Sequence, residues 1–220
     1  MHCSIWSKIK FPLFIVLALC LYPPSLASDS GYSRYGNFVV DYSYLNGEKL
    51  RKEGDEYFVK GYDSPTKAEQ ERHYQTAMQK YYMLSQVYPA DYYAYVQMAR
   101  INDENGRDVL AKKYYNQAFN LDKRNPYTNF YFAEYNTKRG RYHKALKYYL
   151  TAYNNGYKNN YITNLKLAEL YEKLGDMEQA KKYYEDSYKI DPGAGNVVDK
   201  IDSLNALNYK NHEYYYRIRE

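Results

Sequence analysis

The chain has 220 residues and a formal net charge of +5, with 31 lysines and arginines against 26 acidic residues. This length fits one folded domain with a tail, and a hydrophobic fraction of 45% is typical of a globular protein. The composition therefore excludes a multi-pass membrane protein, a disulfide-stapled miniprotein and a large multidomain enzyme. Tyrosine occurs 33 times, against 7 phenylalanines and 1 tryptophan. Because a buried tyrosine hydroxyl needs water or a hydrogen-bond partner, we expect a thin fold in which much of the core lies close to the surface.

Residues 1–27 are predicted to be a secretory signal peptide rather than part of the fold. Lys8 and Lys10 form a basic start, an apolar run follows over 11–21, and Ala27 ends a small-residue cleavage motif. The apolar run is too short to span a bilayer comfortably, since spanning takes about 20 residues. The protein is therefore expected to be exported, to the periplasm or the exterior if its source is bacterial.

Both cysteines, Cys3 and Cys20, lie inside this leader, so the processed chain would have no thiol chemistry and no cysteine-based metal site. Two alternatives stay open: membrane anchoring by an uncleaved signal, and a lipid anchor at Cys20. Leu19 argues against the lipid anchor, because lipoprotein signals usually carry a small residue there. The mature chain is predicted to have no transmembrane helix. Its charges are interspersed rather than clustered, which argues against binding nucleic acid.

An internal repeat runs through the second half of the chain. Gly106, Gly140 and Gly175 are 34 and 35 residues apart. An alanine lies seven residues before each glycine and another five residues after it, and a tyrosine follows four residues later. Another small residue lies three positions after each tyrosine. These columns hold Ala99, Ala133 and Ala168; Ala111, Ala145 and Ala180; Tyr115, Tyr149 and Tyr184; and Ala118, Ala152 and Ser187.

This spacing resembles the tetratricopeptide repeat, a helix-turn-helix unit of about 34 residues. The family pattern has small residues where the two helices touch, an aromatic residue in the second helix and a proline after it. Pro89 and Pro192 occupy the closing position in two copies, while Lys123 and Tyr157 replace it in the others. The resemblance implies an all-α fold class: a right-handed helical-repeat solenoid of about four two-helix units with a C-terminal capping helix.

The first copy of the repeat is lengthened. Its first helix carries Gly54 in the small-residue column and Gly61 in the turn column, but Ala77 and Tyr81 of its second helix arrive 11 residues late. Eleven residues make almost three helical turns, so the insertion keeps the inner face turned inward. The spacing therefore predicts one long helix over 65–88.

The predicted organisation divides the chain into a leader, a repeat region and a C-terminal extension. The extension begins with a capping helix, because apolar residues recur there among polar ones, and a short apolar run in the leader could dock locally. The predicted parts are the signal peptide 1–27, a flexible leader 28–46, four repeats over 47–194 (47–91, 92–125, 126–160 and 161–194), the capping helix 195–208 and a tyrosine-rich tail 209–220.

No catalytic or metal-binding pattern stands out. His73, His143 and His212 fall in different parts of the chain, without acidic residues at ligand spacing. The sequence shows neither a glycine-rich phosphate loop nor a nucleophile elbow. Tyrosine pairs such as Tyr148-Tyr149 are interpreted as a core residue with a flanking neighbour rather than as a ligand platform. We therefore expect no cofactor, no metal and no enzymatic activity.

The resemblance also implies a binding surface. Family members usually bind partners along a concave face lined by positions 2, 5, 9, 12 and 13 of the first helices. One edge of that face is apolar here, which suits an extended or helical peptide, and the other is charged. The alternative is that these side chains partly pack between first helices. The residues predicted to line this partner groove are Tyr93, Val96, Arg100, Tyr127, Phe130, Glu134, Ile162, Leu165 and Glu169.

The resulting hypothesis is an exported scaffold or assembly adaptor that binds a protein or peptide partner in this groove. Chaperone C-terminal tails are disfavoured as partners, because the lysine and asparagine that clamp such tails at positions 5 and 9 are absent. The alternative function is a glycan-associated role in polysaccharide export, with exposed tyrosine faces stacking on sugar rings.

Overall fold

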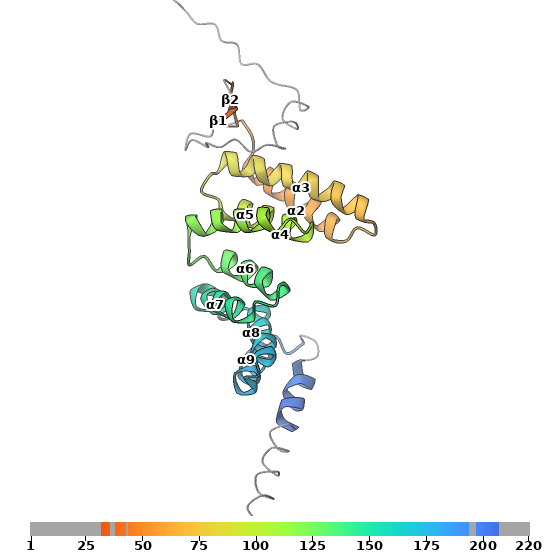
Figure 1. The fold of residues 1–220 in the computed structure, drawn as a ribbon, viewed down its shortest axis with the longest axis vertical. Helices are drawn as coiled ribbons and strands as arrows, with labels where there is room; N and C mark the ends of the chain where they lie inside the picture. The colour runs from red at the N-terminus through yellow and green to blue at the C-terminus, as the bar shows by residue number, and fades with distance from the viewer. Residues whose placement is uncertain (1–31, 36–37, 43, 194–196, 207–220) are drawn as a thin grey trace, which may run out of the picture. The chain divides into compact units, whose positions relative to one another are not determined.

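The computed structural model describes residues 32–35, 38–42, 44–193 and 197–206. The predicted signal peptide and the tyrosine-rich tail lie outside these residues. Figure 1 shows the elements in chain order. They are β1 (Tyr32–Tyr35), β2 (Phe38–Asp41), α2 (Gly47–Tyr62), α3 (Lys67–Val87), α4 (Tyr92–Glu104), α5 (Asp108–Leu121), α6 (Pro126–Lys138), α7 (Tyr142–Ala152), the short wide turn η1 (Tyr153–Tyr157), α8 (Tyr161–Leu174), α9 (Met177–Ile190) and a C-terminal helix over 197–206.

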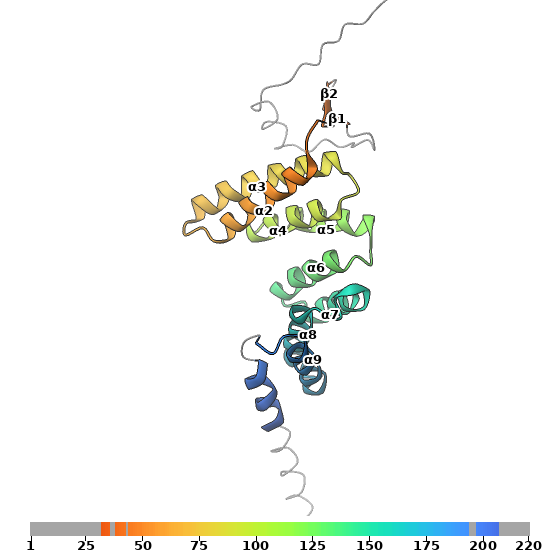
Figure 2. The ribbon, with the colours of Figure 1, turned by 180° about the vertical axis from the view of Figure 1, so that it is seen from behind.

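The described residues fall into two compact units, an N-terminal unit up to Tyr114 and a C-terminal unit from Tyr115 onward. In the N-terminal unit, α2 and α3 lie side by side and α3 also contacts α4 (Figures 1 and 2). In the C-terminal unit, α6 pairs with α7, α7 contacts α8, and α8 pairs with α9. The expected fold class is confirmed: the protein is an all-α helical repeat built from two-helix units.

The recurring glycines lie where a first helix turns into a second one. Gly106, Gly140 and Gly175 have φ angles of 69°, 66° and 83°. This left-handed backbone region is strained for a residue with a side chain, whereas glycine adopts it freely. The turn explains why glycine recurs at this spacing.

The small-residue and tyrosine columns form the contacts between paired helices. Ala145 and Ala180 have no exposed surface, and Tyr149 and Tyr184 are 1% exposed. All four belong to one core cluster of the C-terminal unit. An alanine at a helix crossing lets two backbones approach closely, and the tyrosine ring fills the space beside it. The prediction that these columns form the core is confirmed.

The first helical pair differs from the others in length. The long second helix predicted for this copy is present as α3, a single helix of 21 residues. The placement of Gly61 at a turn is wrong, because α2 continues through it to Tyr62. Gly61 is buried against the ring of Tyr74. Since α3 extends further toward its own start, α2 extends with it, and the glycine serves close helix packing instead of a turn.

The leader contains regular structure that the sequence analysis did not predict. The strands β1 and β2 pair antiparallel, with Tyr35 opposite Phe38 and Tyr32 opposite Asp41. Two residues, glycine and asparagine, separate the strands in the sequence, a spacing and composition typical of a hairpin. The sequence predicts a flexible leader over 28–46 with a short apolar run that could dock locally, and that run, Phe38-Val39-Val40, lies in β2.

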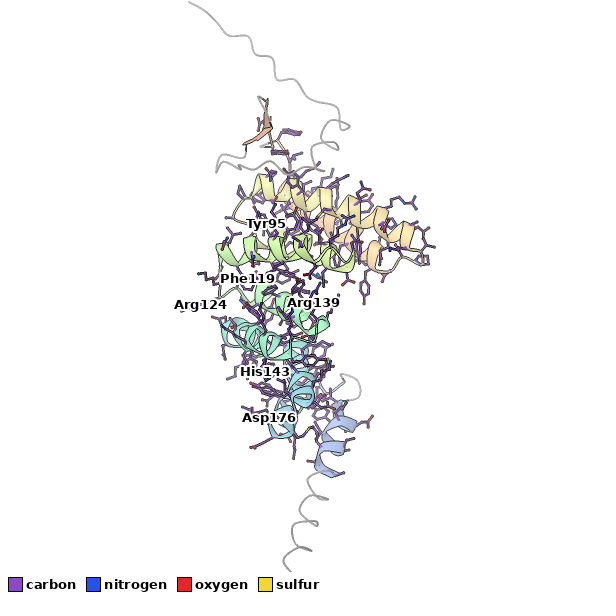
Figure 3. All side chains as sticks on the ribbon, in the orientation of Figure 1. Tyr95, Phe119, Arg124, Arg139, His143 and Asp176 are labelled. Carbon is purple, nitrogen blue, oxygen red and sulfur yellow. The ribbon has the colours of Figure 1, made fainter. Side chains whose placement is uncertain are left out.

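Side-chain caps fix where the helices begin. Asp176, labelled in Figure 3, accepts a hydrogen bond from the backbone of Gln179 at the start of α9. Such caps satisfy backbone donors that a helix leaves unpaired. The first helices α2, α4, α6 and α8 are capped in the same way by Asn46, Asp91, Asn125 and Asn160.

The C-terminal helix closes the core of its unit. Val197 and Leu204 are buried in the same cluster as Tyr184, and Ile201 packs partly against it. These three residues lie on one helical face at spacings of four and three. The predicted capping helix is therefore present over 197–206, while the residues on either side of it lie outside the described ranges.

Candidate functional site

In each unit, a hollow lies over the face of a first helix. The hollow in the N-terminal unit has a volume of about 710 Å³ and is lined by α2 alone, including Arg51, Asp55 and Val59. The hollow in the C-terminal unit has a volume of about 520 Å³ and is lined by α8, α9 and the C-terminal helix. The second hollow is the more developed site, because three elements enclose it.

Tyr93, a predicted groove residue of the N-terminal unit, is bound to its own neighbours. The hydroxyls of Tyr81 and Tyr93 both donate to Oδ1 of Asp55, each at 2.6 Å. The guanidinium of Arg51 lies 4.5 Å from the centre of the Tyr93 ring and forms an ion pair with Asp91 at 2.5 Å. Tyr93 is therefore part of an internal polar network as well as of the surface.

The other two predicted groove residues of this unit differ in exposure. Val96 is 0% exposed, so it has no surface to offer a partner, and we remove it from the groove. Arg100 is half-buried, with its guanidinium 4.4 Å from the centre of the Phe58 ring and a hydrogen bond to Gln97 at 2.8 Å. The alternative of packing between helices thus accounts for Val96, while Arg100 keeps part of its surface.

The aromatic part of the predicted groove in the C-terminal unit lies on α6. Phe130 is half-buried, and its ring centre is 5.5 Å from that of Tyr149 and 6.1 Å from that of Tyr157. The Tyr127 ring makes an edge contact with Tyr131 at 4.7 Å. Contacts of this kind stabilise the fold, and they also hold rings rigidly at a surface. Phe130 and Tyr127 therefore combine core packing with partial exposure.

The charged part of the same face is organised around buried tyrosine hydroxyls. The Tyr149 hydroxyl donates to Oε1 of Glu134. Burial, the negative charge of Glu134 and, more weakly, that of Glu169 raise the pKa of Tyr149. Burial opposes the charge on Lys166, but its hydrogen bond to Glu169 and the proximity of Glu134 outweigh burial and raise its pKa. The structure thus brings the predicted residues Glu134 and Glu169 into one electrostatic neighbourhood.

The hollow itself continues this arrangement on α8. The Tyr184 hydroxyl donates to Glu172 at 2.7 Å, and the Lys200 ammonium of the C-terminal helix donates to the same carboxylate at 2.9 Å. These two hydrogen bonds lower the pKa of Glu172. Ile162 is 39% exposed on the same helix, and Leu165 is half-buried. The complete lining is Leu165, Glu169, Glu172, Lys173, Tyr184 and Lys200.

Sequence reasoning found Leu165 and Glu169 of this lining but did not assign Tyr184 or Lys200 to it. Tyr184 was interpreted purely as core, although its hydroxyl reaches the hollow's edge through Glu172. A usable signal was present: each buried tyrosine hydroxyl needs an acceptor, and an acidic residue of the paired helix supplies it. Lys200 gave no such signal, because it belongs to the helix outside the repeat pattern.

The described residues contain neither a cluster of metal-ligating side chains nor a membrane-spanning helix. No group of three or more histidine, cysteine, aspartate or glutamate side chains there could hold a metal ion. Among the same residues, no helix is long and apolar enough to cross a membrane. His143, labelled on α7 in Figure 3, is exposed, and the His73 ring lies 6.0 Å from that of Tyr57.

Comparison with known proteins identifies the repeat. Residues 92–125 and 163–193 match the family model of the tetratricopeptide repeat, so the chain contains repeats of this family. The TPR repeat-containing protein MJ1428 of Methanocaldococcus jannaschii is 28% identical over 137 residues, which is 56% of this chain and 24% of that protein. The chain thus spans about a quarter of the length of the curated relative that it matches.

Solved structures share the fold at low identity. PilF of Pseudomonas aeruginosa is 20% identical, with a TM-score of 0.59 over 76% of this chain and 72% of that one. PilW, described as a widely conserved type IV pilus biogenesis factor, is 17% identical, with a TM-score of 0.60 over 80% of each chain. MamA is 16% identical, with a TM-score of 0.55 over 75% of this chain and 86% of that one. These likenesses show that the chain shares a helical-repeat fold with these proteins.

Proposed function

We propose that this protein is an exported scaffold or assembly adaptor that binds a protein or peptide partner along the first-helix face of its C-terminal unit. The observation that carries the proposal is the hollow of about 520 Å³ over α8. Rigidly held aromatic and aliphatic side chains on α6 and α8 accompany it, next to paired charges. A partly apolar hollow with convergent polar groups is the usual form of a protein's binding site.

Export is proposed on the sequence of the leader. A basic start, an apolar run and a small-residue motif ending at Ala27 are typical of a cleaved signal. Fractionation of the native source followed by N-terminal sequencing tests this directly. A mature chain that begins at Ser28 outside the cytoplasm supports export, while an intact leader in the cytoplasm contradicts it.

Two isoleucines of the C-terminal unit provide a matched test of the binding face. Ile162 lies on the first-helix face and Ile190 at the end of α9, and each is 39% exposed. Ile162→Glu introduces a charge into the proposed face, whereas Ile190→Glu makes the same change elsewhere at equal exposure. We expect co-purification of the partner from the native compartment to fail for Ile162→Glu alone, with equal melting temperatures for both variants. Equal capture by both variants would contradict this location.

The glycan alternative has less support from the described residues. Among the residues that the structure describes, the exposed tyrosines are Tyr44, Tyr62, Tyr88 and Tyr188. They lie at loops or helix ends of different elements, so they do not form a paired aromatic platform. Soluble glycans added to the co-purification experiment test this alternative, since a glycan-dependent complex would be displaced by them.

A further inference from the structure

The hollow of the C-terminal unit has both an apolar side and a charged side. Leu165 and Ile162 are three residues apart on α8 and therefore share one helical face. Tyr184 is 1% exposed, so surrounding side chains hold its ring in a fixed position at the hollow. A hollow of about 520 Å³ falls within the range of ligand-binding clefts and has room for more than one side chain.

The carboxylates of this hollow are already neutralised by the protein. Glu169 pairs with Lys166 at 3.0 Å. Glu172 pairs with Lys200 at 2.9 Å and also accepts the Tyr184 hydroxyl. The nearest acidic residue of α6 outside the lining, Glu134, is held by Tyr149.

Lys173 is the cation of the lining that makes no close ion pair with a described carboxylate, although its charge adds to the effect of Lys200 and Tyr184 in lowering the pKa of Glu172. Its side chain is exposed, and its ammonium lies 5.5 Å from the centre of the Tyr142 ring. No carboxylate forms an ion pair with it among the described residues. An anionic group of a ligand would therefore meet, at the rim, a cation without a close ion pair, whereas a cationic group would compete with Lys166 or Lys200 for its carboxylate.

We infer that this hollow binds a partner segment in which an aliphatic side chain contacts Leu165 and an adjacent acidic group pairs with Lys173. This inference rests on the proposed function and names the chemistry of its partner. The aliphatic contact supplies buried apolar area, and the acidic group selects orientation and partner, because charge complementarity at a rim favours specificity over affinity.

An array of immobilised ten-residue peptides tests the inference with the full chain. Its members share one sequence apart from a central pair, which is Leu-Asp, Leu-Asn, Leu-Lys or Ser-Asp. We expect capture to be strongest on Leu-Asp peptides and to weaken as salt rises, because exposed charges are screened. Lys173→Gln should reduce binding to Leu-Asp peptides about 1.5- to fivefold, the range typical of an exposed ion pair.

Reversing the charge of Lys173 gives a result that a loss of folding cannot imitate. Lys173→Glu should shift the preference from Leu-Asp to Leu-Lys peptides, a gain that an unfolded variant cannot show. Lys147→Gln is the matched control, because Lys147 is an exposed lysine of α7 outside the lining. It should bind Leu-Asp peptides as the wild type does.

Three results would overturn the inference: no capture by the wild-type chain, equal preference for Leu-Asp and Leu-Lys peptides, or equal effects of Lys173→Gln and Lys147→Gln. The comparison of Ile162→Glu with Ile190→Glu decides the proposed function separately. If that comparison succeeds while the array fails, the face binds its partner through other chemistry. If both fail, the face is not the binding site.

Discussion

Gly54 provides the most direct test of the close contact between α2 and α3. A Cβ atom added to Gly54 would lie 2.7 Å from Cε1 of Tyr81 and 3.0 Å from Cδ1. Ordinary contacts are several tenths of an ångström longer, and Tyr81 is 0% exposed with its hydroxyl bonded to Asp55. The ring therefore cannot move away without losing that hydrogen bond.

The expected effect of Gly54→Ala is a balance of two opposing terms. Alanine is favoured over glycine inside a helix by about 1 kcal/mol. Overpacking a rigid core lowers stability by about 1–3 kcal/mol. We therefore expect Gly54→Ala to lower the free energy of unfolding by up to about 2 kcal/mol in urea titrations followed by circular dichroism.

Replacing the ring should reverse the sign of this effect. In a Tyr81→Ala background the ring atoms that the added Cβ would meet are gone, so only the helix preference of alanine over glycine remains. Gly54→Ala should then raise stability by up to about 1 kcal/mol. If the substitution stabilises the wild-type chain, or has the same effect in both backgrounds, the close contact between α2 and α3 is refuted.

Three further predictions concern buried hydroxyls and charge. The Tyr74 hydroxyl is buried and has no hydrogen-bond partner among the described residues, so Tyr74→Phe should leave stability unchanged or raise it by up to about 1 kcal/mol in thermal melts. Tyr81→Phe removes a bonded hydroxyl from the same helix and should lower stability by about 1 kcal/mol; equal effects of the two would contradict this. Because Lys200 and Tyr184 lower the pKa of Glu172, its contribution should be complete above the pKa of an unfolded glutamate and lost as pH falls through the lower folded pKa. Glu172→Gln should therefore flatten the acid side of the stability profile, and an unchanged profile would refute this.

The sequence predicted those parts of the fold that depend on backbone geometry and residue size. Gly140 marks a turn because only glycine adopts its φ angle readily, and Ala145 marks a contact because a larger side chain would not fit. Gly61 was misassigned because close packing and a turn both select glycine. Only the length of α3, which places Tyr74 opposite Gly61, distinguishes the two causes.

The candidate site was predicted less completely, for physical reasons. Helical position alone gave Leu165 and Glu169, which line the hollow, but it also gave Val96, which is buried. The position of a residue on a helix fixes the direction in which its side chain points, whereas the exposure of that side chain depends on which other elements pack over it. Lys200 could not be predicted, because its contact with Glu172 depends on how the C-terminal helix packs against α8.

The abundance of tyrosine connects the core of this protein to its surface. A core built from phenylalanine would leave the acidic residues of the first helices free to bind partners. Here the hydroxyls of Tyr81, Tyr149 and Tyr184 reach out of the core to Asp55, Glu134 and Glu172. These acids are therefore committed to holding the rings in place, since a buried hydroxyl without an acceptor lowers stability. In the C-terminal hollow, Tyr184 commits Glu172 in this way and Lys166 pairs with Glu169, which leaves Lys173 as the charge that the proposed partner would meet.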